Sequence, residues 1–224
     1  MTHSDVREAT FCFVDLAGFT ALTETHGDRA AADLVERFLA LVEASLNDET
    51  RIVDTIGDAV LTISPSPDEA LEFLARLFSK VATEPDFPVL RAGLHHGEVV
   101  ERGGRFFGTT LNLAARVAGQ ARGDQVLATR PVADAARRAG IQVTSLGAHT
   151  LRNLREPVEL FSLRLSGASA SGVLDPVCRM RIDPEHAPAH LRFDGKDFWF
   201  CSLECAGLFA AAPERYASSI SPND

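Results

Sequence analysis

Two acidic residues stand where the sequence predicts that strands end. Asp15 closes the apolar run ATFCFVD at 9–15, which is typical of a buried central strand. Asp58 belongs to the Gly-Asp dipeptide in the middle of RIVDTIGDAVLTIS, a pattern typical of a tight hairpin. Carboxylates that meet at one sheet edge suit two Mg²⁺ ions, which bridge a triphosphate, activate a hydroxyl and neutralise a leaving pyrophosphate.

An Asn and an Arg lie one helical turn apart in TTLNLAARVAGQA. This segment, from Thr109, has small residues on its packing face and is predicted to be a helix. Asn112 and Arg116 would then project together and donate to charge that develops on a reacting phosphate. A lone Asp beside Gly is typical of a turn or a helix cap, so the interpretation depends on the combination.

Three of the four cysteines lie in the last quarter of the sequence. Cys201 and Cys205 are four positions apart and share one helix face, so both thiolates can reach one soft metal that Cys178 completes. The candidates for a fourth ligand are His186, His190, Asp175 and water. The alternative is that these cysteines are reduced, buried and purely structural.

The composition bounds the class of protein. With 224 residues, 46% of them hydrophobic, the chain can form one substantial core and a small second domain. A net charge of -9 argues against binding to nucleic acid or to anionic membranes, which attract clustered Lys and Arg. The N-terminus has no signal-peptide pattern and no apolar run approaches the roughly 18 residues of a membrane span, so we expect a cytoplasmic protein. Cys12 lies in an apolar run and is expected in the core.

Hydrophobic periodicity predicts the elements that position these residues. Apolar residues recur at helical spacing over 28–46 and again over 68–82. Residues 89–100 have strand character, and Gly103 and Gly104 mark a turn. The order β, α, β, β, α, β is typical of a ferredoxin-like sandwich, so the predicted fold class is α+β.

A short polar stretch is predicted to divide the chain. Residues 166–173, SGASASGV, are small and lack any apolar period, which is typical of a flexible tether. The first domain is therefore placed at 1–165 and the second at 174–224. The second is a small, cysteine-rich α+β unit whose few aromatic residues provide a minimal core. A domain of this size usually needs additional cross-linking, such as a bound metal.

Two adjacent histidines, His95 and His96, precede Gly97 in the predicted strand. A general acid or base needs a partner that positions it, and none is identifiable in the sequence. We therefore interpret both as strand residues.

Four segments resemble, in order, motifs of the catalytic domain of class III adenylyl and guanylyl cyclases. They are FVDLAGFTAL at 13–22, DTIGDAV at 54–60, GLHHGEVV at 93–100 and FGTTLNLAARV at 107–117. The resemblance covers about the first three quarters of the chain. It implies an enzyme that converts ATP, GTP or both into a 3′,5′-cyclic nucleotide and pyrophosphate.

The resemblance also implies roles for single residues. Asp15 and Asp58 match the family's two metal-binding aspartates, which would hold two Mg²⁺ or Mn²⁺ ions together with the backbone carbonyl of Leu16. Asn112 and Arg116 match the pair that orients the ribose and stabilises the transition state. In the family one subunit supplies the aspartates and the other the Asn and Arg, at a head-to-tail interface. A homodimer is therefore implied.

The positions that contact the nucleotide depart from the family pattern. Arg152 stands where the family has a phosphate-binding Lys, and Asn153 replaces the Gly that follows it. Asp54 and Arg105 reverse the charges of the two adenine-reading positions. A carboxylate accepts from N1 and N2 of guanine while Arg donates to O6 and N7, which favours GTP. The alternative is that Asp54 and Arg105 pair with each other and leave base selection loose or the pocket blocked.

The second domain resembles the YHS and TRASH-like metal-binding modules. The resemblance rests on DPVCRM followed by FDGKDFWFCSLECAGLFAAAPERY, which covers nearly all of this domain. It implies that Cys178, Cys201 and Cys205 bind Zn²⁺ or another soft transition metal. Arg179 replaces a Gly that commonly follows the first Cys, which alters the local turn.

Two functions fit this sequence. The first is a dimeric cyclase whose output is biased by metal bound at the tail. The second is a cyclase-shaped regulatory module that has lost turnover and whose tail senses or carries metal. The first is favoured because both metal aspartates and the pair Asn112 and Arg116 are present, and a decayed site often loses such residues.

Overall fold

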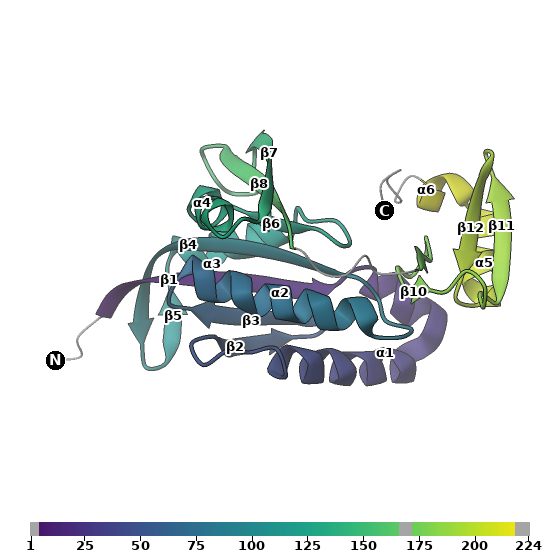
Figure 1. Cartoon of the computed structure of the whole chain (residues 1–224), viewed down its shortest axis with the longest axis horizontal. Coiled ribbons are helices and arrows are strands. Elements are labelled where there is room, and N and C mark those ends of the chain that lie inside the picture. The colour runs from purple at the N-terminus through teal and green to yellow at the C-terminus, as the bar shows by residue number, and fades with distance from the viewer. Residues whose placement is uncertain (1–4, 166–171, 218–224) are drawn as a thin grey trace.

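The computed structural model describes residues 5–165 and 172–217 (Figure 1). The strands are β1 (Asp5–Leu16), β2 (Arg51–Ile56), β3 (Ala59–Ser64), β4 (Leu90–Arg102), β5 (Arg105–Phe107), β6 (Val126–Ala128), β7 (Gln142–His149), β8 (Val158–Arg164), β9 (Val173–Leu174), β10 (Arg181–Ile182), β11 (Ala189–Phe193) and β12 (Lys196–Phe200). The helices are α1 (Phe19–Glu43), α2 (Pro67–Thr83), α3 (Thr109–Ala118), α4 (Arg130–Arg138), α5 (Leu203–Ala211) and α6 (Pro213–Ala217). Within the described ranges, none of these helices combines the length and the apolar character needed to cross a bilayer.

One sheet organises the first domain. Its strand order is β2-β3-β1-β4-β6-β8-β7, and β5 pairs with β4 outside this path. β1 lies between β3 and β4 and is antiparallel to both. The chain order β1-α1-β2-β3-α2-β4 confirms the predicted ferredoxin-like α+β sandwich.

The two faces of the sheet carry different helices, because side chains along a strand alternate between faces. Cys12, Val14 and Leu16 of β1 point into the larger core, which α1, α2 and α4 complete. Phe11 points the other way and packs against Phe106 and against Ala114 of α3. The buried position of Cys12 is as predicted. By the same alternation, the last odd-numbered residue of β1, an aspartate, belongs to the α3 face.

The helix predicted over 28–46 starts earlier than its periodicity indicates. α1 begins at Phe19 and is interrupted at Gly27, whose φ of 81° and ψ of 164° are not helical. The interruption breaks the apolar period, which is why the first turns escaped prediction. The predicted hairpin turn is confirmed, and Gly57 there has a φ of 61° that favours glycine.

The second domain is built from two short strand pairs and two helices. β9 pairs with β10, β11 pairs with β12, and α5 packs on both strands of the second pair. Phe198, Phe200 and Phe209 form its aromatic centre, with ring centroids 4.8 and 5.2 Å from Phe209. Of the predicted tether at 166–173, residues 166–171 lie outside the described residues, and Val173 already belongs to β9.

Backbone hydrogen bonds join the second domain to the first. The Val89 N–H donates to the Arg179 carbonyl at 3.2 Å, and the Arg181 N–H donates to the Phe87 carbonyl at 3.1 Å. The Ala17 N–H in turn donates to the Val89 carbonyl at 2.9 Å. The loop that carries the first cysteine of the second domain is thereby connected to the residues that follow β1.

A glycine allows α3 to approach β4 closely. A Cβ atom at Gly93 would lie 2.0 Å from the backbone nitrogen of Ala118 at the end of α3. Because backbone cannot yield as a flexible side chain does, we expect Gly93→Ala to lower the free energy of unfolding by about 3 kcal/mol. Urea denaturation measures this change. Gly207→Ala in α5, where an added Cβ meets no atom within 4 Å, is the control and should be neutral or slightly stabilising. Equal losses in the two variants would contradict the close approach.

Candidate functional site

Asp15 and Asp58 lie at the same edge of the sheet. Asp15 ends β1, and its register partner on β3 is Ala59, the residue that follows Asp58 in the hairpin. The antiparallel pairing of β1 and β3 therefore brings the strand end and the hairpin tip together. Periodicity and turn chemistry predicted this juxtaposition from the sequence.

Arg91 binds the carboxylate of Asp15 through two hydrogen bonds. Nε donates to Oδ1 at 2.6 Å and Nη2 donates to Oδ2 at 2.9 Å. Arg91 lies directly opposite Asp15 in the register of β1 with β4. This bidentate contact orients the carboxylate and offsets one negative charge. Arg91 was not predicted from the sequence, where its only signal was its place at the start of the predicted strand at 89–100.

The surroundings of Asp58 disfavour its charged form. Burial raises the pKa of Asp58, and the negative charge of Asp15 raises it further, whereas Arg91 acts in the opposite direction. Hydrogen bonding to Asp15 raises the pKa of Arg91. Two carboxylates with one compensating cation leave an excess of negative charge, which a bound cation relieves. Their oxygen donors fit hard ions such as Mg²⁺ and Mn²⁺.

Asn112 and Arg116 lie on α3, which packs over β1 and β4. Asn112 is exposed and Arg116 is half-buried. Among the described residues neither has a hydrogen-bond or ion-pair partner, in contrast to Asp15 and Arg91 on the neighbouring strands. Their donor groups are therefore available to a ligand or to another subunit.

The two predicted base-reading residues are both exposed. Asp54 on β2 accepts a hydrogen bond from the N–H of Thr55 at 2.9 Å. Arg105 on β5 forms no ion pair with Asp54, so the alternative of mutual pairing is not realised within the part of the protomer that the structure describes. β2 and β5 nevertheless approach each other, because the guanidinium of Arg51 lies over the ring of Phe106 at 5.3 Å from its centroid.

Arg152 lies in the turn between β7 and β8 and is exposed. Asn153, which follows it, has a φ of 60°. Asn tolerates this left-handed conformation better than most other non-glycine residues.

His95 and His96 are strand residues of β4, as predicted. Contrary to expectation, each has a hydroxyl partner: His95 Nδ1 lies 2.6 Å from Thr129 Oγ1, and His96 Nδ1 lies 3.0 Å from Thr10 Oγ1. Burial lowers the pKa of His95 to about 4, so this ring is neutral at physiological pH.

The three cysteines of the second domain gather at one point. Cys178 Sγ lies 3.4 Å from Cys201 Sγ, which lies 3.7 Å from Cys205 Sγ. Hydrogen bonds with these neighbouring thiols raise the pKa of Cys178 and lower the pKa of Cys205. Asp175 is buried and accepts the N–H groups of Val177 and Cys201, both at 2.8 Å, so it holds the two cysteine loops together.

The predicted candidates for a fourth ligand are engaged elsewhere. His186 contacts Asp183 and His190 contacts Asp197, and both histidines are exposed. The carboxylate of Asp175 accepts backbone N–H groups.

The nitrogen donor beside the thiols comes instead from the first domain. His26 Nε2 of α1 lies 3.4 Å from Cys201 Sγ and 3.9 Å from Cys205 Sγ. Together with Cys178 these residues offer four ligand atoms within 4.8 Å of one another. His26 was not predicted from the sequence, because 175 positions separate it from Cys201.

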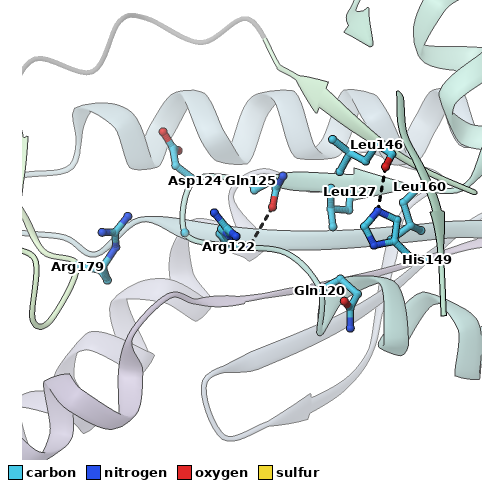
Figure 2. A pocket seen from close by; sticks show the side chains of 10 residues that line it. Gln120, Arg122, Asp124, Gln125, Leu127, Leu146, His149, Leu160 and Arg179 are labelled. Atoms are coloured by element: carbon cyan, nitrogen blue, oxygen red, sulfur yellow. Dashed lines mark hydrogen bonds between the residues drawn. The ribbon is translucent and has the colours of Figure 1, made fainter. Parts of the chain in front are cut away.

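A cavity of about 550 Å³ opens between the loop after α3 and β7 (Figure 2). Gln120 and Arg122 line it from the loop, and His149 lines it from the end of β7. Arg179 enters it from the second domain. The cavity contains none of the residues that sequence analysis singled out for catalysis or metal binding.

Residues 1–164 match the protein-family model described as the adenylate and guanylate cyclase catalytic domain. The chain belongs to this family. Residues 173–219 match the YHS domain. Both matches agree with the resemblances found in the sequence.

Several proteins similar to the cyclase domain are named adenylate cyclases. A pH-sensitive adenylate cyclase of Mycobacterium tuberculosis (strain CDC 1551 / Oshkosh) is 36% identical over 170 residues, which cover 74% of this chain and 43% of the relative. An adenylate cyclase of Streptomyces griseus is 38% identical over 117 residues, which cover 51% of this chain and 29% of the relative. The chain thus spans less than half the length of these relatives.

Solved structures share the fold of the cyclase domain. The crystal structure of an adenylyl cyclase from P. aeruginosa has a TM-score of 0.63 at 17% identity and covers 76% of this chain and 100% of that chain. The guanylate cyclase domain from Catenaria anguillulae in complex with GTP has a TM-score of 0.63 at 15% identity and covers 72% and 98%. At these identities the likeness concerns the fold alone.

The raised pKa of Asp58 predicts that its charge destabilises the metal-free cyclase domain. The folded protein holds this proton more tightly than the unfolded chain, so stability falls as the pH rises above the ordinary carboxyl pKa of 3.8. We expect metal-free Asp58→Asn to melt above the unaltered protein at pH 7, with a difference that shrinks toward pH 4.

Thermal unfolding followed by circular dichroism measures this difference. Mg²⁺ should raise the midpoint of the unaltered protein and leave that of Asp58→Asn unchanged. Asp54→Asn, which alters an exposed carboxylate, is the control and should leave the midpoint unchanged at both pH values. A lower midpoint for Asp58→Asn at pH 7 would show that the charge stabilises the fold.

Proposed function

We propose that this chain converts a nucleoside triphosphate into a 3′,5′-cyclic nucleotide and pyrophosphate at the interface of a homodimer. The observation that carries the proposal is the meeting of Asp15 and Asp58 at one sheet edge, where their negative charges repel each other. Family membership supports it. The absence of a partner for Asn112 and Arg116 among the described residues supports a role for them across the interface.

At the α-phosphorus the reaction forms one bond and breaks one, and the 3′-hydroxyl loses its proton. The ribose 3′-oxygen attacks the α-phosphorus, the bond from that phosphorus to the bridging oxygen breaks, and pyrophosphate leaves with the electron pair while the hydroxyl proton passes to water. Asp15, the Leu16 carbonyl and Asp58 would hold two Mg²⁺ or Mn²⁺ ions. When bound, these ions favour loss of the hydroxyl proton and neutralise the leaving pyrophosphate.

The side chains on α3 act from the other subunit in this proposal. Asn112 orients the ribose so that its 3′-oxygen lies in line with the leaving group, which removes much of the entropic cost of the reaction. Arg116 donates to the charge that grows on the phosphate oxygens. Arg152 binds the phosphates, and its fixed charge and planar donors suit that contact. Arg91 positions Asp15 and does not touch the substrate.

Sites shared between subunits predict complementation. Asp58→Asn and Arg116→Ala should each abolish cyclic nucleotide formation as homodimers. Random mixing makes half of the dimers mixed, and each mixed dimer keeps one intact site of two, so we expect about one quarter of full activity. Product formation measured after the two variants are co-expressed tests this.

The control is a mixture of Asp58→Asn with Asp15→Asn. These variants alter the same half of the site, so their mixed dimers should stay inactive. Failure of the first mixture to regain activity would place each site within one subunit. If the unaltered dimer gave no product with either nucleotide and Mn²⁺, the regulatory alternative would replace the enzyme.

We propose further that the site accepts GTP at least as well as ATP. Asp54 and Arg105 are exposed and unpaired with each other, so both are available to a base. A carboxylate and a guanidinium match the donors and acceptors of guanine, whereas the carboxylate repels N1 of adenine.

Reversing both charges should reverse this preference. We expect the ratio of kcat/KM for ATP to that for GTP to rise about tenfold or more in Asp54→Lys/Arg105→Asp, since one good base contact contributes roughly 1–3 kcal/mol. Parallel turnover assays with the two nucleotides measure the ratio. Arg138→Asp, a charge reversal on the exposed end of α4, is the control and should leave it unchanged. A strong ATP preference in the unaltered protein would contradict the proposal.

The second domain binds Zn²⁺ or another soft transition metal through Cys178, Cys201 and Cys205 in this proposal, and metal occupancy biases the output of the cyclase. The grouping of the three thiols and the match to the YHS domain support the metal site. Backbone hydrogen bonds connect Arg179 of this domain to Val89, and Val89 to Ala17 just after β1, which supports a physical route between the two sites.

A further inference from the structure

We propose that His26 of the cyclase domain is the fourth ligand of the cysteine site, so that one metal ion ties the two domains together. The inference rests on the proposed metal binding by the three cysteines. It adds a ligand from outside the YHS domain, and the metal ion adds a bond to the contacts through which that domain docks.

The spacing of the four donor atoms fits a tetrahedral site. Bonds of about 2.3 Å to sulfur and about 2.0 Å to nitrogen place the ligand atoms of tetrahedral Zn²⁺ about 3.5–3.8 Å apart. Cys201 Sγ lies 3.4 Å from Cys178 Sγ, 3.7 Å from Cys205 Sγ and 3.4 Å from His26 Nε2. The remaining separations are at most 4.8 Å. Small side-chain rotations convert this cluster into a regular tetrahedron of three sulfurs and one nitrogen.

The donor set also suits the ion. Thiolate and imidazole ligands select Zn²⁺ and related soft metals, and three Cys with one His is a closed structural combination. Cys178 and Cys205 are buried and Cys201 and His26 are half-buried, so the site lies at the edge of the packed interior. An ion there would be shielded from competing water ligands.

The conformation of α1 places His26 beside the cysteine cluster. His26 ends the first helical segment of α1, and Gly27 breaks the helix with a φ of 81°. An added Cβ at Gly27 would meet no atom within 4 Å, so the glycine is required by its backbone conformation and not by crowding. The break separates the direction of the His26 segment from that of the rest of the helix.

The other contacts between the domains bring the first cysteine to the same place. A Cβ at Gly18 would lie 2.8 Å from Arg179 Cγ and 3.2 Å from the Cys178 carbonyl, so the cysteine loop rests on the backbone just before α1. Arg181 also lies 3.8 Å from Asp124 across the interface. A bound ion would add to these contacts a bond that holds α1 to the cysteine loop.

Cobalt binding to the full-length, reduced protein tests the assignment. Co²⁺ in a tetrahedral site of thiolates and imidazole gives strong absorption bands that report ligand number and type, and Zn²⁺ competition gives the affinity. Loss of a supporting residue behind a ligand typically weakens metal binding 10–100-fold, so we expect His26→Ala, which removes a ligand, to weaken Zn²⁺ binding by about 100-fold or more. His26→Cys should restore tetrahedral bands with stronger sulfur absorption.

Hydrogen exchange provides a second readout that a merely structural histidine would not change. Zn²⁺ should slow exchange over residues 19–26 of the unaltered protein and have no effect there in His26→Ala. His190→Ala, which alters an exposed histidine of the YHS domain, is the matched control and should bind metal normally. Circular dichroism of the metal-free variants verifies folding, and His26→Cys keeps the test valid if His26→Ala does not fold.

Two variants distinguish the role of His26 from metal binding by the cysteines. Unchanged Co²⁺ bands and Zn²⁺ affinity in His26→Ala, with a large loss in Cys201→Ser, would overturn the role of His26 alone. Unchanged metal content in Cys201→Ser as well would overturn metal binding by the cysteines.

Discussion

β1 pairs with β4 along its whole length, from Asp5 opposite Glu101 to Leu16 opposite Leu90. This register sets Asp15 against Arg91, and it sets Phe13 against Gly93, where α3 comes closest to the sheet. A slip of one residue would move every side chain of β1 to the opposite face. Asp15 would then point toward α1 and α2, where the apolar core leaves no place for a carboxylate. The orientation of Asp15, its contact with Arg91 and the position of α3 beside it all depend on this one pairing.

The sheet edge that carries Asp15 and Asp58 holds two negative charges that the fold itself does not require. Folding partly removes the Asp58 carboxylate from water and places it near the charge of Asp15. Arg91 offsets only part of the resulting electrostatic free-energy cost. Local conflicts of this kind are characteristic of functional sites, because the stabilising partner is a ligand. The cysteine cluster shows the same feature in another form, with three thiols brought together in a small domain whose aromatic centre does not require them.

The sequence predicted those parts of the site whose signals are local. Asp15 ends an apolar run and Asp58 sits in a hairpin turn, so a few neighbouring residues determine where each lies. Asn112 and Arg116 are one helical turn apart, which also requires only local geometry. Arg91 escaped prediction because its contact with Asp15 depends on the register of two strands 76 positions apart. His26 escaped for a stronger reason, since its neighbours are set by how two separately patterned domains dock.

The short extended segment at 87–89 offers backbone groups that the cysteine loop at 179–181 occupies. Unpaired groups of this kind on the border of a sheet are templates for pairing with other chains, and proteins protect such borders by covering them. The cysteine loop of the YHS domain covers these backbone groups of its neighbour, apart from any role of metal. A cyclase domain separated from it would leave these backbone groups open to water or to pairing with another chain.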